Sequence, residues 1–567
     1  MDGRRRGDIR RARAHLSARE RTRGARREQD RARPRKDRTP RRLRGEEPNL
    51  EEVQITSSGR EEALEHWWTR ETRMSSTNNR VVRTETALGA EAQLAARARQ
   101  VLRQSDMGDW TRAAPNLYPH QWSWDSAFIA IGLAHLGTRR AAKELLTLFE
   151  HQWRTGKVPH IVFNPEAPPD SYFPGPEHWA CAAASPDAPP APPYTSCLCQ
   201  PPVHAIAALR VWEVAERKGG EGVDEAWAFL RQIYPKLLLW HRYLMTHRDP
   251  EGSGLVTIYH PWESGTDNSP RWDAALRAVE VGDLPPYPRY DLRHVANPSE
   301  RPTRADYDRY LWLVKLIKKA GCDEESIYRS HPFLVKDVLF SAIVVAANEA
   351  LLEIAALVGA EAGNHTLIAN WIARGHQGLN SLWDPELGLS LDYDLRAGRP
   401  LRARTVAGFA PLVAGRQSTE RLETLITALE SSAFTGHPWL RWPVPPSTSP
   451  LQEGFRRRSY WRGPTWPVVN WLLWWSLLRA GQSERAQRLR QASLQQLVIG
   501  GLGEYFDPFT GKLLGANDQS WTAAVALDWL ATQGCGALRR TATLLQPGRY
   551  ETIRNGTSDP LGSVRTA

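Results

Sequence analysis

The chain is poor in cysteine and lacks a long apolar run, and both shortages narrow the class of protein to which it can belong. It carries five cysteines in 567 residues, too few for a disulfide-stabilised secreted scaffold. No apolar run reaches the roughly 20 residues that a transmembrane helix needs, and no apolar signal segment follows the basic N-terminus. We therefore expect a cytoplasmic protein with no membrane partner.

The cysteines have neither the spacing of a zinc site nor an even number for pairing. Cys181, Cys197 and Cys199 share one proline-rich loop, whereas Cys322 and Cys535 lie far along the chain. Structural zinc sites favour C-x2-C pairs or added histidines at helical spacing. We expect free thiols in a reducing compartment, with no metal and no other cofactor.

The chain also has no excess of acidic residues, and its formal net charge is +11. Residues 1–50 hold 19 Lys+Arg and 8 Asp+Glu, so the rest of the chain is neutral, with 55 residues of each sign. An arginine-rich segment without aromatics cannot bury enough apolar surface to fold, and we expect a mostly disordered extension over 1–85. It could bind polyanions, but a true start near Met74 is the simpler interpretation. Nucleic-acid binding is not expected of the remaining chain.

Apolar residues at helical spacing dominate from about residue 86 onward. They predict helices over 88–103, 125–136, 138–155, 202–218, 223–246, 303–320, 335–359, 364–382, 404–414, 416–432, 464–480, 483–499 and 519–533. Strand-like alternation occurs over 387–395. About a dozen helices in consecutive pairs, without a fixed 34- or 40-residue repeat, favour an all-α (α/α)6 toroid over an α-solenoid. We expect 86–535 to form this domain and 536–567 a C-terminal tail.

The longest loops concentrate acids and aromatics. We expect the loops over 156–201, 247–302 and 433–463 to form a lid over a central pocket. The chemically rich blocks are NLYPHQWSWDSAF (116–128), HPWESGTDNSPRWD (260–273), SYWRGPTWPVVNWLL (459–473), GGLGEYFDPFTG (500–511) and NDQSWTAA (517–524). None of them matches a phosphate-binding or dinucleotide fingerprint. Aromatic faces stack well on sugar rings, although most of the 24 tryptophans should simply pack in a helical core.

Two of these blocks carry carboxylates suited to cleavage of a glycosidic bond. That reaction needs one protonated carboxyl for the leaving oxygen and one ionised carboxylate to activate water or attack. Asp267 and Glu263 lie four residues apart in a glycine-containing turn, where Arg271 could keep one charged and leave the other as the acid. Glu504 follows a glycine-rich turn, which lets backbone approach a ligand closely. Each acid alone would equally suit a capping residue; several such blocks together favour a carbohydrate enzyme.

The segment ESGTDNSPRW resembles the general-acid motif of trehalase-like and processing α-glucosidase-like (α/α)6 hydrolases. With its DNSPRWD form, the chain most resembles the bacterial glucosylglycerate and mannosylglycerate hydrolases of glycoside hydrolase family 63. The blocks WSWDSAF, YWRGPTWPVVNWLL and GLGEYFDPFTG agree with that family in kind and order. The resemblance covers about residues 110–535.

The resemblance implies an inverting glycosidase that cleaves α-glucosylglycerate or α-mannosylglycerate, compatible solutes, to hexose and glycerate. Asp267 would be the general acid and Glu504 the general base on water. The sugar subsite would be lined by Trp124, Asp125, Gln200, Trp262 and Trp461. The glycerate subsite would hold Arg301, supported by Tyr118, Tyr307, Tyr460 and Gln519, with Tyr172 as a lid residue. An arginine grips a carboxylate through two parallel hydrogen bonds, which a neutral leaving group does not require.

Several alternatives stay open. Arg304 or Arg309 could replace Arg301, and Arg462 could contact substrate or brace its loop. The small glycoside bound here could instead be trehalose or another neutral α-glucoside, and the sequence does not separate glucose from mannose. A glycan-binding toroid without catalysis and an epimerase on the same fold are further hypotheses. The histidines available to an epimerase would be His120, His204, His260 and His294. A homo-oligomer is also open.

Overall fold

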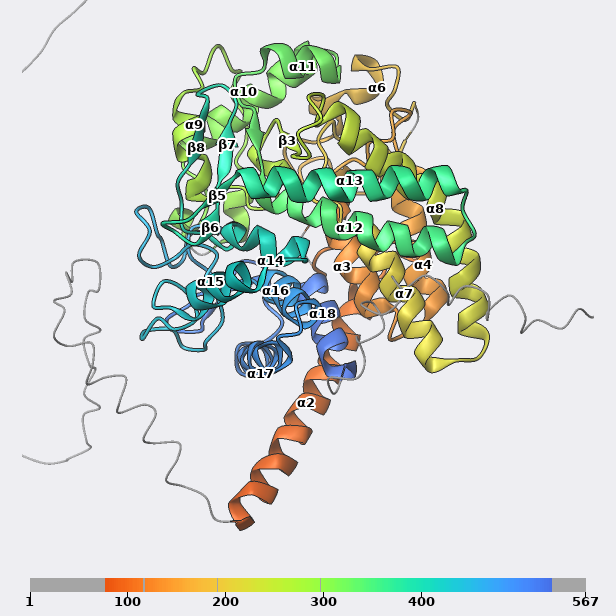
Figure 1. Ribbon diagram of the computed structural model, residues 1–567. Coiled ribbons are helices and arrows are strands. Elements are labelled where there is room, and N and C mark those ends of the chain that lie inside the picture. The colour runs from red at the N-terminus through yellow and green to blue at the C-terminus, as the bar shows by residue number, and fades with distance from the viewer. Residues whose placement is uncertain (1–76, 116–117, 191, 296, 533–567) are drawn as a thin grey trace, which may run out of the picture. The chain divides into compact units, whose positions relative to one another are not determined.

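The computed structural model describes residues 77–532 except 116–117, 191 and 296 (Figure 1). The first described helix, α2, begins at Thr77. The extension expected over 1–85 is described only from Thr77, where residues 77–85 are helical, and the tail expected over 536–567 lies outside the described residues.

Within these residues, twelve helices form two concentric rings, the (α/α)6 toroid that the helical periodicity predicts. The inner helices are α3 (Ser123–Leu133), α7 (His204–Lys218), α12 (Val338–Leu357), α14 (Ala410–Ala414), α16 (Pro467–Arg479) and α18 (Ser520–Ala531). Each packs against the next, and α18 closes the ring against α3. The outer helices are α2 (Thr77–Ser105), α4 (Thr138–Glu150), α8 (Glu221–His247), α13 (Ala362–Ser381), α15 (Thr419–Glu430) and α17 (Ser483–Gly500).

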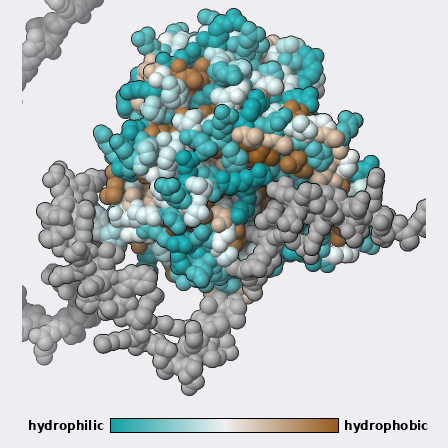
Figure 2. Space-filling model, viewed as in Figure 1, coloured by the Kyte–Doolittle hydropathy of each residue, from teal (hydrophilic) through white to brown (hydrophobic). Residues whose placement is uncertain are grey.

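The inner helices are mostly buried because most of their residues are apolar. Every residue of α3 is buried, and α12 buries nearly all of its first three turns. Asp337 begins α12 by accepting hydrogen bonds from the backbone N–H groups of Leu339 and Phe340. By length and composition alone α12 could cross a membrane, but 83% of its most apolar window is buried inside the fold, as in a core helix. On the face shown in Figure 2, the described surface is mainly hydrophilic, with scattered apolar patches.

Short elements fill the connections between the ring helices. The further helices are α5 (Pro176–Trp179), α6 (Cys181–Ala184), α9 (Asp273–Arg277), α10 (Arg304–Lys319) and α11 (Glu324–Ser330), with 3-10 turns η3 (Pro261–Ser264), η4 (Pro270–Trp272), η5 (Tyr290–His294), η6 (Pro298–Glu300) and η7 (Val406–Phe409). The strands are β1 (Gln121–Trp122), β2 (Ile161–Val162), β3 (Thr257–Ile258), β4 (Val335–Lys336), β5 (Trp383–Asp384), β6 (Leu389–Ser390), β7 (Asp392–Asp394), β8 (Arg399–Leu401), β9 (Tyr505–Phe506) and β10 (Leu513–Leu514). An antiparallel sheet in the order β3-β4-β7-β8 joins the connection between α8 and α12 to the connection between α13 and α14.

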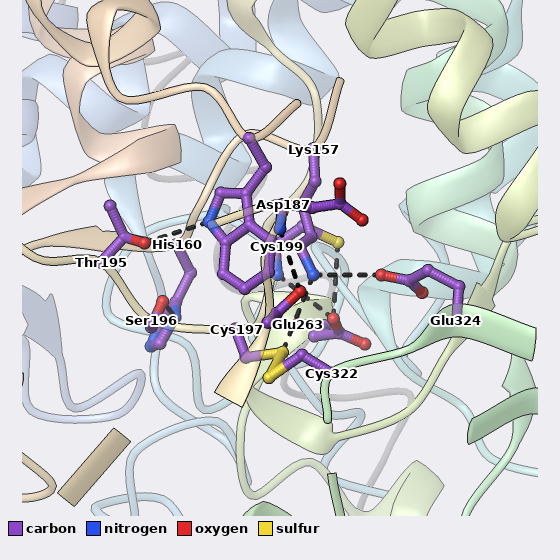
Figure 3. The surroundings of a disulfide bond; sticks show 12 residues. Lys157, His160, Asp187, Thr195, Ser196, Cys197, Cys199, Glu263, Cys322 and Glu324 are labelled. Atoms are coloured by element: carbon purple, nitrogen blue, oxygen red, sulfur yellow. Dashed lines mark hydrogen bonds and ion pairs between the residues drawn. A yellow bond between two sulfur atoms is a disulfide. The ribbon is translucent and has the colours of Figure 1, made fainter. Parts of the chain in front are cut away.

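The cysteines depart from the sequence expectation. Cys197 and Cys322, 125 residues apart in the chain, form a disulfide with their Cα atoms 6.2 Å apart (Figure 3). The expectation of free thiols is wrong for this pair, because the proline-rich loop folds against the turn that follows α10. Cys181 and Cys199 are free and buried, and Cys535 lies outside the described residues.

Candidate active site

One cavity collects every residue to which the family resemblance assigns a role in catalysis or substrate binding. Its lining includes Tyr118, Trp124, Asp125, Tyr172, Gln200, Trp262, Asp267, Arg301, Tyr307, Tyr460, Trp461, Glu504 and Gln519. Several of these residues stand at the N-terminal ends of inner helices: Trp124 and Asp125 lie in the first turn of α3, and Gln519 directly precedes α18. The ring therefore brings together segments that are hundreds of residues apart in the chain.

Asp267 lies in the turn between η3 and η4 and is partly open to the cavity. The Tyr310 hydroxyl donates to its carbonyl oxygen at 3.2 Å, and Arg271 Nη2 donates to the hydroxyl of Thr266 at 2.7 Å. Burial of the carboxyl, with a smaller contribution from the charge of Glu504, raises the pKa of Asp267 to about 7, although a backbone hydrogen bond and the charge of Arg301 oppose the rise. Asp267 can therefore keep a proton at neutral pH, as a general acid must.

Glu504 lies just beyond the C-terminal end of α17 and is 2% exposed. Its Oε2 accepts the backbone N–H of Ala516 at 2.8 Å. Burial raises the pKa of this carboxyl, while Arg301 and the Ala516 N–H oppose the rise because both favour its charged form. Gly515 has φ +70°, and a Cβ there would lie 2.4 Å from Oε2 of Glu504. The missing side chain thus makes room for this carboxylate.

The charge balance around Asp267 differs from the expected one. Arg271 contacts neither Asp267 nor Glu263; its Nη1 bonds Asp392 at 2.8 Å. Glu263 is instead neutralised by Arg248, whose two terminal nitrogens reach its two oxygens at 2.8 and 2.9 Å. The proposed division of charge by Arg271 is wrong, because Glu263 points away from the cavity into a buried ion pair. Arg301 takes the place of the expected cation.

Arg301 is the cation that lines the cavity. Its Nη2 donates to the Tyr118 hydroxyl at 3.0 Å, and its guanidinium lies 4.6 Å from the centre of the Tyr460 ring. Its Nε is buried without a hydrogen-bond partner among the described residues. The residue is 6% exposed, and a buried guanidinium with a free donor is suited to an anionic ligand.

The alternative arginines do not line the cavity. Arg304 is exposed and pairs with Asp308 at 3.1 Å, while Arg309 donates to the backbone of Ala305. Arg462 braces its loop, because it pairs with Asp273 at 2.7 Å and also donates to backbone oxygens.

Two tyrosines beside Arg301 have unusual backbone conformations. Tyr118 has φ 56° and Tyr460 has φ 40°, both in the left-handed region that disfavours large side chains. Such conformations persist where the surrounding structure fixes them, and they gather at ligand sites. Both tyrosine side chains contact the guanidinium, so the strained residues lie beside the buried Arg301.

Asp125 is a third carboxyl in the cavity, and burial together with the charges of Glu504 and Asp267 raises its pKa to about 8. It is therefore protonated at neutral pH and can donate a hydrogen bond to a sugar hydroxyl. In the same cavity, Trp461 stacks on Trp466 with ring centres 3.7 Å apart. Trp124 lies 6.4 Å from Trp461 and completes a rigid aromatic wall.

Sequence reasoning missed several lining residues, chiefly Trp122, His160, Asp291 and Trp521. Trp122 and Trp521 lie inside blocks that had been singled out, so their proximity to Trp124 and Gln519 was an available signal. His160 had none: it is a single histidine in KVPHIVF, held by a hydrogen bond between its Nδ1 and Ser196 Oγ.

Three of the candidate histidines of an epimerase, His120, His204 and His260, do not line the cavity. His120 accepts from the backbone N–H of Asn164 through Nδ1, and His204 bonds Ser123 through Nε2. Both nitrogens of His260 are engaged by the backbone of Trp262 and Tyr310. These three histidines are structural; the side chain of His294 is outside the described parts.

An (α/α)6 toroid whose loops bring paired carboxyls into an aromatic cavity defines a glycoside hydrolase. Residues 118–522 match the family model of the mannosylglycerate hydrolase MGH1-like glycoside hydrolase domain, and the chain belongs to this family. The match spans both proposed catalytic acids, so the family assignment covers them.

Relatives of known name extend over nearly the same region. The chain is similar to the glucosylglycerate hydrolase of Mycolicibacterium hassiacum, with 46% identity over 438 residues, 77% of this chain and 98% of the relative. It is 42% identical over 434 residues to the mannosylglycerate hydrolase of Thermus thermophilus, covering 76% of this chain and 99% of the relative. A crystal structure of the glycoside hydrolase family 63 mannosylglycerate hydrolase from Thermus thermophilus, in complex with Tris and D-glycerate, is 42% identical and superposes with a TM-score of 0.70, covering 77% and 99% of the two chains.

Proposed function

We propose that this enzyme hydrolyses α-glucosylglycerate or α-mannosylglycerate to hexose and glycerate with inversion at the anomeric carbon. The observation that carries the proposal is the buried Arg301, held between Tyr118 and Tyr460 in the same cavity as Asp267 and Glu504. A neutral aglycone would leave this cation without a partner. The names of the relatives, and the D-glycerate in the Thermus thermophilus structure, support the same substrate class.

The reaction proceeds by a single displacement. Asp267 donates its proton to the glycosidic oxygen, and the bond between that oxygen and the anomeric carbon breaks, which releases glycerate. Glu504 accepts a proton from water as the water oxygen bonds the anomeric carbon from the opposite face. Asp267 ends ionised and Glu504 protonated, and proton exchange with solvent restores both. An α-glycoside therefore yields the β-hexose first.

The raised pKa of Asp267 predicts how the rate of hydrolysis depends on pH. We expect kcat/KM for glucosylglycerate to fall as pH rises above about 7, because the acid then loses its proton. The fall should be much weaker with α-glucosyl fluoride, whose leaving group needs no proton. Initial rates at low substrate between about pH 5 and 9 measure both limbs. A profile for glucosylglycerate that stays level across the basic range would contradict the role of Asp267.

Arg301→Ala should separate a glycerate-specific enzyme from a neutral α-glucosidase. We expect about a 100-fold or larger loss of kcat/KM on glucosylglycerate, because a charge-assisted bidentate contact is removed from a buried site. Any slow cleavage of trehalose by the wild type should change little. Arg304→Ala, which removes an exposed arginine three residues away, is the matched control and should behave as wild type. Efficient wild-type cleavage of neutral α-glucosides would refute the glycerate specificity.

The Arg301→Ala variant tests neither the stereochemistry of the reaction nor the identity of the sugar, and two further measurements do. Proton NMR of the first-formed anomer distinguishes inversion from retention, and a first-formed α-hexose would refute inversion. Parallel assays of glucosylglycerate and mannosylglycerate decide the sugar, since these substrates differ in the orientation of the 2-hydroxyl alone.

A further inference from the structure

The loop that carries Gln200 into the cavity is fixed by a covalent bond to a distant part of the chain. This segment, residues 194–200, is called here the Cys197 loop. The Cys197–Cys322 disulfide ties its centre to the turn between α10 and α11 (Figure 3). The two cysteines are 2% and 4% exposed, so the bond lies inside the protein.

Contacts on both sides of Cys197 reach the cavity. One residue before it, Ser196 bonds Nδ1 of His160, and the Ser196 N–H donates to the carbonyl oxygen of Ile161 at 3.1 Å. Three residues after it, Oε1 of Gln200 accepts the backbone N–H of Trp124 at 3.3 Å. Since His160, Gln200 and Trp124 all line the cavity, the disulfide braces one wall of it from behind.

The same loop is joined to the segment that carries the general acid. The Cys199 N–H donates to Oε1 of Glu263 at 3.2 Å. Glu263 in turn is held by Arg248 and accepts the Tyr259 N–H at 2.7 Å. A shift of the Cys197 loop would therefore move the sugar-binding side chains relative to Asp267, four residues beyond Glu263.

A chain of buried ion pairs runs beside the disulfide and joins the same regions. Lys157 Nζ pairs with Glu324 Oε1 at 3.1 Å, and Glu324 Oε2 pairs with Arg248 Nε at 3.0 Å. Lys157 Nζ also lies 3.7 Å from the sulfur of Cys197. Figure 3 shows the ion pair between Lys157 and Glu324 in the same region as the disulfide. These ion pairs do not involve the cysteines, so we expect the reduced protein to keep its fold while the loop loosens.

We propose that the Cys197–Cys322 disulfide is a positioning bond for the sugar subsite, so that the redox state of this pair sets the affinity for substrate. The expected effect on substrate affinity rests on the proposed function. Reduction by a dithiol balances as thiol–disulfide exchange: the dithiol becomes a cyclic disulfide, and the protein S–S bond becomes two thiols. The reduced loop samples more conformations, and substrate binding must then order Gln200 and His160 at a cost in affinity.

The kinetic test compares the oxidised wild type with the double variant Cys197→Ser/Cys322→Ser. We expect the KM for the preferred glycosyl-glycerate to rise about 5- to 20-fold with kcat within about 3-fold, the size expected for weakening one or two hydrogen bonds. Wild type purified in dithiothreitol should match the variant, and oxidation by diamide should restore the low KM. Mass spectrometry after alkylation in denaturant counts the free thiols in each sample.

Two control variants separate positioning from general destabilisation. Cys181→Ser removes a buried free thiol of the same proline-rich region and should keep the wild-type KM and the response to reduction. Asp528→Asn disturbs a buried carboxylate that accepts from Arg210 and Trp471, away from the cavity lining. It should lower the melting temperature without raising KM. An equal KM for the double variant and the oxidised wild type would overturn the proposal, as would a pair that diamide cannot oxidise.

A measurement without substrate keeps this proposal distinct from the proposed function. Amide hydrogen exchange in the free enzyme should be faster for peptides covering 194–200 in the double variant, with α12 unchanged. Faster exchange in an enzyme that cleaves no glycosyl-glycerate would refute the substrate and leave the positioning role standing. Unchanged exchange over the Cys197 loop would refute the positioning role, whatever the substrate.

Discussion

Asp267→Asn is expected to lower kcat on glucosylglycerate by about 10²- to 10⁴-fold, the range measured when a general acid is removed. The carboxamide keeps the size of the side chain but cannot release a proton to the leaving oxygen. KM should change little, because the hydroxyl and carboxylate contacts of the substrate come from other residues. Steady-state kinetics at about pH 6 to 7, where the wild-type acid is still protonated, measure the loss.

The leaving group provides the control for that result. Glycerate leaves as an alkoxide unless it is protonated, whereas fluoride leaves as a weak base. Asp267→Asn should therefore hydrolyse α-glucosyl fluoride at a rate close to that of the wild type. An equal loss on both substrates would mean that the substitution distorts the cavity, and an unchanged rate on glucosylglycerate would remove Asp267 from the mechanism.

The toroid was predictable because its signal is local. Most inner helices are largely apolar, and the outer helices repeat buried positions at helical spacing, so the thirteen predicted segments all contain helices. The helix α10 was predicted over 303–320, but its position in the fold was not. It lies outside the double ring and carries Tyr307 toward the cavity. Its capping box, Thr303 with Asp306, marks its start but says nothing about where the helix docks.

Long-range contacts were not predictable in the same way. The Cys197–Cys322 bond and the Arg248–Glu263 pair depend on how loops fold over one another, and no local pattern records this. The prediction for Arg271 failed for the same reason. Its nearness to Asp267 in sequence suggested an ion pair, whereas a strand more than 100 residues away supplies its actual partner, Asp392.

The active-site residues were predictable to a greater degree than the contacts that hold them. The blocks around Trp124, Asp267, Trp461 and Glu504 each combine acids or aromatics with polar or turn-forming residues, and the resemblance to a family assigned residues within them. The structure places all of these in one cavity. Their individual roles stay predictions. His160 also lines the cavity, but no motif surrounds it, so a search for motif blocks does not find it.

Glu504→Gln is expected to lower kcat by about 10²- to 10⁴-fold as well, because the amide cannot accept a proton from water. The fold should be retained, since the amide oxygen can still accept the Ala516 N–H that now bonds Oε2. Steady-state kinetics on glucosylglycerate and on α-glucosyl fluoride measure the change. In contrast to the acid variant, this variant should lose activity on both substrates, because both require an activated water.

Azide distinguishes the base from every other residue in the cavity. It attacks without losing a proton, so azide should restore turnover of α-glucosyl fluoride by Glu504→Gln and yield the β-glucosyl azide. Gly515 leaves room for the glutamine side chain, as it does for the carboxylate of Glu504. Formation of the azide by Asp267→Asn and not by Glu504→Gln would exchange the two roles. An α-configured azide would instead require a covalent intermediate, because two displacements restore the starting configuration and one reverses it.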